Sequence, residues 1–289
     1  MKERSYDLMW KIGVRVREIV KQTPFLNPVE EIMRRVGPRL IPPPAKDTEV
    51  SLPFEMKMMI PAGLPNARSF AAGRYERDVA RIFTNIISSC MNVAVVGAGI
   101  GYHALLASPL VKPHGHVHTF EPDLRNYTYL QRNIQLNGCQ NITAVHKAVS
   151  NYSGSGVFHQ DKYGVEGHLI QEPSVNSIPI QTVSLDDYFA ELGWPKLDIL
   201  MIDVEGAEEK VLKGMKKLSY KNPKLKLLLE LHISFIKRDG GNVNTIPELL
   251  KELGFIKGYI INKELKACSF PTSLPAERNA YDLLLVKDN

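Results

Sequence analysis

Two hydrophobic periodicities alternate along the central part of the chain. Short apolar runs, several of them β-branched, occupy residues 93–96, 116–120, 142–146, 197–202 and 225–231. A helix is predicted from about residue 73 to 89, before the first run. Between the runs apolar residues recur at helical spacing, in segments that end near residues 110, 136 and 192 and in a segment over 207–218. Alternating strands and helices of this kind predict an α/β fold with a doubly wound, mostly parallel sheet.

The last quarter of the chain changes this rhythm. A helix is predicted over 247–253, followed by strands at 255–261 and 281–287 with no helical crossover pattern between them. We therefore expect these two strands to pair antiparallel at one edge of the sheet. Residues 150–183, rich in Gly, Ser and His, predict hairpins and loops in place of a helix.

The N-terminal segment has a different character. Residues 5–22 have the pattern of a basic amphipathic helix, 29–36 that of a second short helix, and Pro42–Pro44 mark a stiff linker. We divide the chain into an N-terminal extension (1–48) and an α/β domain (49–289). The basic helix is expected to pack on that domain or on a second subunit, giving a homodimer, with membrane-surface binding as the alternative.

Composition narrows the class of protein only slightly. Lys and Arg number 36 against 31 for Asp and Glu, a net charge of +5. This excess permits an anionic substrate, a nucleic acid or an anionic membrane, and requires none of them. The three scattered cysteines argue against a disulfide framework or a zinc cluster. With no apolar run long enough for a membrane helix and no secretory signal at the N-terminus, we expect a soluble, cytoplasmic enzyme.

A glycine-rich loop gives the sharpest local signal. Gly97, Ala98, Gly99, Ile100 and Gly101 stand between a predicted strand and a predicted helix, where free N–H groups point at a ligand. The dinucleotide fingerprint G-x-G-x-x-G would place its third glycine at position 102, which is a tyrosine here. The loop therefore favours S-adenosylmethionine over NAD, and disfavours an NAD-dependent oxidoreductase. A structural turn without a ligand is the alternative.

An acidic residue follows at the end of the next predicted strand. Glu121 lies 22 residues after Gly99 (121 − 99). A carboxylate in this place accepts hydrogen bonds from both hydroxyls of a ribose. Since NAD and S-adenosylmethionine both contain a ribose, Glu121 supports a nucleoside ligand without choosing between the two.

Several further motifs occur in a characteristic order over residues ~70–235. They are Gly73–Glu76, Val96–Tyr102, Phe120–Asp123, Asn133–Asn137, Val183–Asp186, Ile202–Glu208 with Val211–Gly214, and Glu230–His232. In this order and spacing the chain resembles the FkbM family of methyltransferases. The resemblance implies a class I fold with a Rossmann-like sheet of about seven strands, S-adenosylmethionine as cofactor, and O-methylation of a sugar or other small-molecule hydroxyl.

The resemblance also implies a set of cofactor contacts. These are Tyr75, Glu76, Gly97, Ala98, Gly99, Gly101, Tyr102, Glu121, Pro122, Ser150 and Asp203. Two positions depart from the family pattern: Val95 stands where an acid usually holds the methionine end, and Ala148–Asn151 lack the acid usual near the adenine. We expect Glu76 to replace the first acid and Ser150 or Asn151 to replace the second.

Catalytic groups are expected just past the carboxyl ends of the strands, where ligands bind in open α/β sheets. Asp203 and Glu205 follow the fourth strand, Glu230 and His232 end the fifth, and the loop region 159–168 is the third candidate. Asp203 is the first choice as base or acceptor-positioning group, with helix capping as its structural alternative. His232 is the second, because imidazole titrates near neutrality; its alternative is a hydrogen-bonded strand-end histidine.

Other chemistry is less well supported by the sequence. Carboxylates plus a histidine also suit Mg²⁺, which is possible here but not expected. His114, His116 and His118 alternate along one strand face, yet no carboxylate or cysteine completes a metal set. We therefore interpret the three histidines as structural.

Two functional hypotheses other than small-molecule methylation stay open. The Asn133–Asn137 helix also resembles a segment of tRNA guanine methyltransferases, but no basic stripe with interleaved aromatics accompanies it. The other hypothesis is a non-catalytic scaffolding module. In that case the replacement of the usual acid by Val95 reflects a loss of cofactor binding. Residues 151–183, 233–245 and the N-terminal segment are expected to form the acceptor wall, because loops carry specificity.

Overall fold

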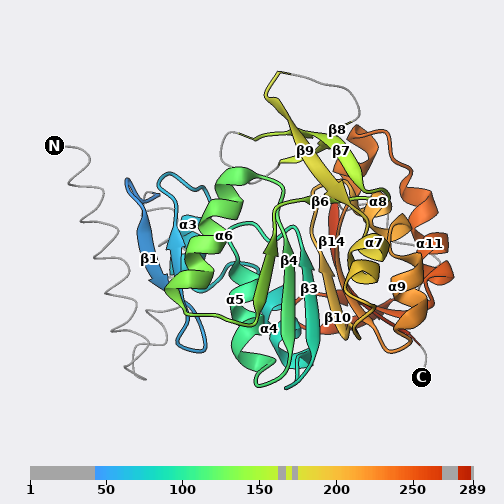
Figure 1. Ribbon diagram of the computed structural model, residues 1–289, viewed down its shortest axis with the longest axis horizontal. Helices are drawn as coiled ribbons and strands as arrows, with labels where there is room; N and C mark the ends of the chain where they lie inside the picture. The colour runs from blue at the N-terminus through green and yellow to red at the C-terminus, as the bar shows by residue number, and fades with distance from the viewer. Residues whose placement is uncertain (1–42, 162–166, 171–174, 269–278, 288–289) are drawn as a thin grey trace.

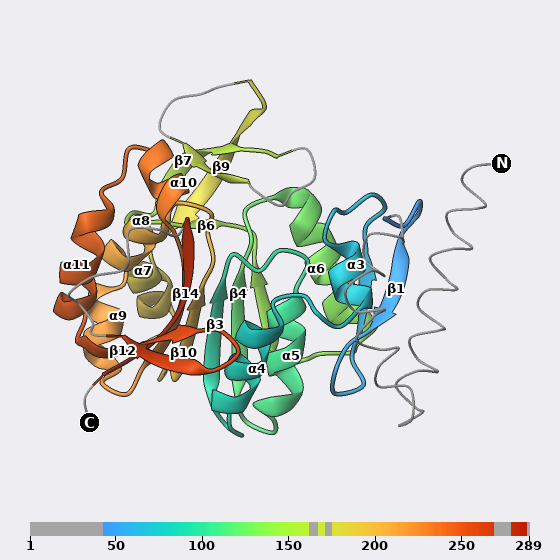
Figure 2. The ribbon, with the colours of Figure 1, turned by 180° about the vertical axis from the view of Figure 1, so that it is seen from behind.

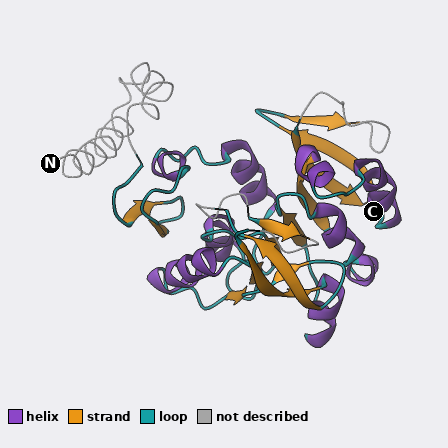
Figure 3. Ribbon diagram, turned by 90° about the horizontal axis from the view of Figure 1, so that it is seen from above, coloured by secondary structure: helices purple, strands orange, loops and turns teal. Residues whose placement is uncertain are grey.

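The computed structural model describes residues 43–161, 167–170, 175–268 and 279–287 (Figure 1). The two helices predicted at 5–22 and 29–36 lie outside the described residues. The central feature is an eight-stranded sheet with the order β13-β12-β14-β11-β10-β3-β4-β5. Helices cover both of its faces, as the views from behind and from above show (Figures 2 and 3).

The parallel strands confirm the predicted doubly wound arrangement. They are β3 (Asn92–Val96), β4 (His116–Phe120), β5 (Ile142–Val145), β10 (Ile199–Ile202) and β11 (Lys226–His232). The chain leaves β3 toward β4 and β5 on one side, and later adds β10 and β11 on the other side. The carboxyl ends of β3 and β10 therefore form a topological switch point, the usual ligand position in such a sheet.

The antiparallel edge was predicted in part. β12 (Phe255–Ile261) and β14 (Ala280–Lys287) pair antiparallel as expected, and β14 also pairs antiparallel with β11. A short strand that the sequence pattern did not indicate, β13 (Leu265–Cys268), adds to β12. Since three of the four β13 residues are exposed, the segment has no hydrophobic alternation to reveal it, and the sheet has eight strands in place of about seven.

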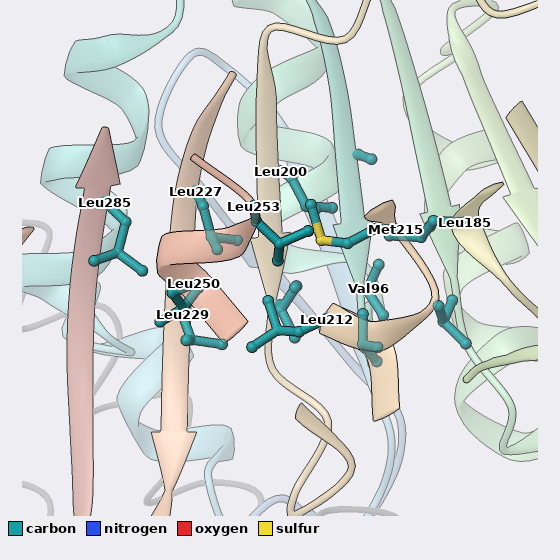
Figure 4. Packing of buried hydrophobic residues seen from close by; sticks show 14 of the residues in the cluster. Val96, Leu185, Leu200, Leu212, Met215, Leu227, Leu229, Leu250, Leu253 and Leu285 are labelled. Carbon is teal, nitrogen blue, oxygen red and sulfur yellow. The ribbon is translucent and has the colours of Figure 1, made fainter. Parts of the chain in front are cut away.

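Side chains of the central strands point alternately to two hydrophobic layers. Val93 and Val95 pack against α4 (Arg77–Ile86), α5 (Tyr102–Leu110) and α6 (Leu124–Leu136) on one face. Ala94 and Val96 face α7 (Leu185–Glu191), α8 (Glu208–Lys213), α9 (Lys216–Lys221) and α11 (Ile246–Glu252) on the other. Leu212, Met215, Leu250 and Leu253 meet the leucines of β10, β11 and β14 in this second layer (Figure 4).

One predicted helix is divided in the structure, and another begins later than predicted. The segment 207–218 forms α8 and α9, which separate at Gly214, where a Cβ would lie 2.2 Å from the Ser150 carbonyl oxygen. The segment 73–89 begins only at Arg77, after the short α3 (Ala67–Ala71). Glu76 has a φ of 41° and interrupts helical geometry there. Its side chain consequently turns toward the carboxyl end of the sheet.

A second, four-stranded sheet stands beyond the carboxyl ends of the parallel strands (Figure 1). It contains β6 (Ala148–Val149), β7 (Gly154–His159), β8 (His168–Ile170) and β9 (Ser177–Val183), in the order β6-β9-β7-β8. This sheet accounts for the hairpins predicted over 150–183. The short α10 (Ile233–Arg238) and a 3₁₀ turn (Val243–Thr245) follow β11 at the same end of the large sheet.

The hairpin of β1 (Thr48–Ser51) and β2 (Lys57–Ile60) packs against α6. Asn133, fully buried on α6, accepts from the Met59 N–H at 2.6 Å and donates to the Ile100 carbonyl at 2.8 Å. Asn133 thus connects the hairpin with the glycine-rich loop. Within the described residues, no helix has the length and apolar character needed to cross a bilayer.

Removing the Asn133 amide is expected to destabilise the protein. Asn133→Ala should lower the free energy of unfolding by about 1–3 kcal/mol, because buried partners lose their hydrogen bonds without access to water. Asn137 makes a similar pair of bonds to Lys57 at the surface, so Asn137→Ala is the matched control with a smaller expected loss. Denaturant unfolding measures both, and equal losses would contradict this role for Asn133.

Candidate active site

A cavity of ≈ 400 Å³ opens at the switch point. Its walls come from the glycine-rich loop after β3, the turn after β4, the segment before α4, the ends of β10 and β11, and the β7–β8 pair. The predicted site residues in its lining are Tyr75, Glu76, Gly97, Ala98, Gly99, Tyr102, Glu121, Pro122, Asp203, Glu205 and Glu230. Most of the predicted site therefore converges on one space.

The glycine-rich loop brings the backbones of β3 and β10 together. Gly97 has a φ of +85°, and a Cβ on it would lie 1.6 Å from the Asp203 carbonyl oxygen. Gly101 (φ +101°) packs against Leu130 of α6 and does not line the cavity. A Cβ on Gly99 would meet no other atom within 4 Å. The close approach at Gly97 therefore fixes where the carboxylates after β10 stand relative to the loop.

Glu121 is held by backbone donors from two sides. Its carboxylate accepts from the Gly99 N–H at 2.7 Å and from the Asp123 N–H at 2.9 Å. Only 4% of the residue is exposed, and burial raises the pKa of Glu121 to about 8 although those two N–H groups oppose the shift. The side chain is thus fixed at the cavity wall, where an external donor such as a hydroxyl favours its charged form.

An aromatic cluster supports the segment before α4. The Tyr75 ring stacks on Phe70 at 3.9 Å between centroids and meets Tyr102 edge-on at 5.2 Å. This packing holds the strained residue Glu76 over the cavity. Burial raises the pKa of Glu76 to about 8, and the nearby Glu230 adds to the shift.

Three carboxylates meet where this segment faces the sheet. Oxygens of Glu76, Asp203 and Glu230 lie within 4.8 Å of one another. Burial and the two neighbouring acids raise the pKa of Asp203 well above its usual range. One oxygen each of Asp203 and Glu76 is buried without a hydrogen-bond partner. Buried carboxylates normally have a partner, so this cluster fits a positively charged ligand.

The nearest histidine to Glu76 brings no charge to the cluster. The His103 Nε2 lies 3.4 Å from a Glu76 oxygen. Burial lowers the pKa of His103 to about 3, so the ring is neutral and the contact is no ion pair. His103 therefore does not compensate the charge of the Glu76, Asp203 and Glu230 carboxylates, and a cation would have to come from a ligand.

The structure does not support His232 as a base. Its Nδ1 lies 3.0 Å from the fully buried Glu208, and its Nε2 lies 3.2 Å from Glu230 and 3.4 Å from Glu205. Burial alone would lower the pKa of His232, but these carboxylates raise it to about 11. The ring is therefore an imidazolium at neutral pH, which compensates charge and accepts no proton.

Metal binding is not required to explain the acids. Two sets of side chains have ligand spacing: Glu76, Asp203 and Glu230, and Asp203, Glu205 and His232. Without a metal the carboxylates around His232 hold a proton on the ring, and a metal ion bound there would have to displace that proton. The first set contains carboxylates alone, and an organic cation satisfies them equally well.

Ser150 was predicted as an adenine contact, but the structure places it outside the cavity lining. Its N–H donates to the Val183 carbonyl, and its hydroxyl donates to Asn151 in the turn after β6. The fully buried residue packs against Gly214 instead. The neighbouring Lys147, Ala148 and Val149 line the cavity in its place.

Some lining residues were not predicted individually. Asn66 and Ser69 precede α4 and lie outside the motifs, Arg74 lies within the motif Gly73–Glu76, and Asn126 lies in the first turn of α6. His168 lies within the loop region 159–168 that the sequence indicated, and it lines the cavity from β8. The signal for His168 was its position in a histidine-containing hairpin, which did not single out the residue.

The histidines of β4 have structural partners. His116 Nε2 lies 2.7 Å from the Thr143 hydroxyl, and His118 Nδ1 lies 2.9 Å from the Tyr188 hydroxyl. The two rings lie on one face of the strand, 4.8 Å apart, as the alternation predicted. Neither histidine lines the cavity. Their hydrogen bonds instead join β4 to β5 and to α7.

The model of the FkbM methyltransferase domain matches residues 96–257, more than half of the chain. The chain belongs to the FkbM methyltransferase family. The FkbM match includes the glycine-rich loop, Glu121, Asp203, Glu205, Glu230 and His232. Tyr75 and Glu76 lie before its first residue, and the structure places both in the cavity lining.

Individual relatives agree with this family. The hexuronic acid methyltransferase AglP of Haloferax volcanii is 29% identical over 143 residues, which cover 49% of this chain and 57% of AglP. The chain thus matches somewhat more than half the length of that relative. Its identity to AglP supports the family and leaves the acceptor to be argued from the site.

Solved methyltransferase structures resemble the chain only loosely. TYW2 of M. jannaschii, in complex with AdoMet, is 15% identical, with coverage of 83% of this chain and 85% of that one and a TM-score of 0.42. Fibrillarin of Aeropyrum pernix, with bound S-adenosyl-L-methionine, is 12% identical, with coverage of 73% and 74% and a TM-score of 0.42. At these scores they add nothing to the topology described above.

Proposed function

We propose that this protein binds S-adenosylmethionine in the switch-point cavity and transfers its methyl group to a hydroxyl oxygen of a sugar or similar small molecule. The observation that carries the proposal is the cluster of Glu76, Asp203 and Glu230 beside the glycine-rich loop. S-adenosylmethionine, when bound, supplies an electrophilic methyl group on a sulfonium and a second positive charge on its ammonium. Both charges suit buried carboxylates.

The order of strands supports a proposal for the other contacts. Two carboxylates of the cluster lie at the ends of β10 and β11 and the third precedes α4, Glu121 follows β4, and Ala148 and Val149 follow β5. A nucleoside ligand that crosses these strand ends in sequence places its methionine end at the cluster and its ribose at Glu121. The adenine then lies against Ala148 and Val149, with Asn126 and Lys147 as the polar groups beside it.

The remaining walls belong to the acceptor in this proposal. Phe158, His168 and Leu169 from β7 and β8 line the cavity, as do Glu205 and Ala207 after β10. The carboxylates of Glu205 and Glu230 repel a carboxylate acceptor and favour a hydroxyl, which donates hydrogen bonds to them. A sugar acceptor is supported by the likeness to AglP, which methylates a hexuronic acid according to its name.

Calorimetric binding of S-adenosylmethionine and S-adenosylhomocysteine tests the donor site, with NAD as the control. We expect micromolar binding of both sulfur ligands and none of NAD. Transfer of labelled methyl to glucose, glucuronic acid and galacturonic acid then tests the acceptor, and alkali distinguishes a stable ether from a labile ester. If neither sulfur ligand binds at millimolar concentration, a scaffolding protein is favoured. If methyl is transferred to RNA and to none of the sugars, an RNA methyltransferase is favoured.

Ligand binding is expected to tighten as pH rises from 6 to 8. The pKa values of Glu76 and Glu121 are raised to about 8 without ligand, so both groups hold protons at pH 6. The ammonium and the ribose hydroxyls favour the carboxylate forms, and binding must release protons. Calorimetry in buffers of different ionisation enthalpy measures this release. Affinity that is flat or falls over this range would contradict it.

The same raised pKa values affect the unliganded protein. A group whose folded-state pKa is raised stabilises the fold fully below its unfolded pKa and loses that contribution as pH rises through the folded value. Stability without ligand should therefore fall between about pH 4.5 and 8. The increase in Tm on adding S-adenosylhomocysteine should be larger at pH 8 than at pH 6, and Glu76→Gln should reduce that difference.

A further inference from the structure

A histidine and an aspartate meet at the acceptor side of the cavity. His168 lines the cavity from β8, and its Nε2 lies 3.7 Å from Oδ1 of Asp239, just after α10. About one tenth of each side chain is exposed. The two residues are 71 positions apart (239 − 168) and are joined only because the small sheet stands over the carboxyl end of the large one (Figures 1 and 2).

Asp239 is fixed in place by its surroundings. Arg238 donates to both of its oxygens, at 2.8 and 3.1 Å, and also donates to the Glu205 carbonyl at 3.3 Å. The Arg238 guanidinium lies 4.4 Å from the centre of the Phe235 ring. A Cβ on Gly206 would come within 2.8 Å of Asp239 Oδ2, so the absence of a side chain at Gly206 makes room for the carboxylate.

We infer that His168 is the general base of the methyl transfer and that Asp239 is its positioning residue, an inference that rests on the proposed function. The acceptor oxygen bonds to the methyl carbon as the carbon–sulfur bond breaks, and that bond's electron pair stays on sulfur. The hydroxyl proton passes to the neutral imidazole of His168, which returns it to water. Asp239 orients the ring and stabilises the imidazolium that forms.

Two other candidate bases, Asp203 and His232, are less suited to this role. Asp203 lies in the carboxylate cluster against the glycine-rich loop, and His232 is an imidazolium between carboxylates. His168 belongs to the small sheet, and Asp203 and Glu230 lie at strand ends of the large sheet, so His168 reaches the cavity from a different wall. The charged and titratable groups beside it are His159 across the strand pair and Asp239 with its bonded Arg238, and Glu205 lines the same cavity.

The test compares His168→Gln and Asp239→Asn with His116→Gln, a control at the amino end of β4 outside the cavity lining. For His168→Gln we expect kcat to fall at least about 100-fold with the acceptor found above, while the Kd of S-adenosylhomocysteine changes less than about twofold. Added imidazole should partly restore kcat in His168→Gly. Asp239→Asn should lower the pKa of the His168 ring, followed by side-chain NMR, and reduce kcat more than it changes KM.

The outcomes separate this inference from the proposed function. Failure of the unchanged protein to bind S-adenosylhomocysteine or to methylate any acceptor of the panel would overturn the proposed function and this inference with it. Normal binding with an undiminished kcat in His168→Gln would overturn this inference alone. A methyl ester as product would also overturn it, because a carboxylate acceptor has no proton to remove.

Discussion

Replacing Gly97 by alanine is expected to lower the free energy of unfolding by about 3–5 kcal/mol and to abolish binding of S-adenosylhomocysteine. Two physical effects combine at this residue. Gly97 has a left-handed φ of +85°, and the new Cβ would overlap the Asp203 carbonyl oxygen at 1.6 Å. A backbone oxygen cannot rotate away as a side chain does, so β10 must shift and carry the Asp203 carboxylate with it.

Gly99→Ala is the matched control for this prediction. Gly99 also has a positive φ, of +52°, but a Cβ there meets nothing within 4 Å. The expected loss of stability is only about 1 kcal/mol, from backbone strain alone. Denaturant unfolding of both variants measures the difference. A similar loss in the two variants would show that strain, and not the approach of β10, makes glycine necessary at position 97.

Glu121→Ala is expected to weaken binding of S-adenosylhomocysteine roughly 100- to 1,000-fold. Two charge-assisted hydrogen bonds to ribose hydroxyls contribute about 3–4 kcal/mol together in a site closed to water. Thermal stability without ligand should change little, because the variant also removes a buried carboxyl whose pKa is raised to about 8 by burial. Calorimetry and thermal unfolding together separate loss of the contact from loss of the fold.

Glu209→Ala serves as the control for the Glu121 variant. Glu209 accepts from Lys213 and Thr245 outside the cavity lining, so its loss should leave ligand affinity unchanged. An affinity of Glu121→Ala within threefold of the unchanged protein would remove the ribose contact from the proposal. The carboxylate cluster would then have to account for binding without it.

Local sequence determined the parallel core of this protein. The apolar runs, the glycine-rich loop and the Asp123 cap of α6, which accepts from the Arg125 and Asn126 N–H groups, each depend on residues close together in the chain. Their periods and spacings are therefore visible without tertiary contacts. Those signals predicted the doubly wound sheet, its antiparallel edge and the acid after β4.

The departures from prediction arise where distant segments impose the backbone. Gly214 ends α8 because Ser150 packs against it, and Glu76 interrupts a predicted helix with a φ of 41°. Strand β13 is held by pairing with β12 and has little hydrophobic pattern of its own. Neither close approach nor edge pairing leaves a periodic signal in the sequence.

By itself, the sequence determined the α/β class, the FkbM resemblance and a set of site residues, most of which line the cavity. Only the tertiary structure decided their chemical states. His232, expected to titrate near neutrality, has its pKa raised to about 11 because three strand-end and helix carboxylates surround it. The tertiary structure also places Ser150 outside the cavity lining. It brings His168 close to Asp239, which lies 71 positions later in the chain. A pKa depends on which charges are brought within a few ångströms, and the order of residues along a chain does not contain those distances.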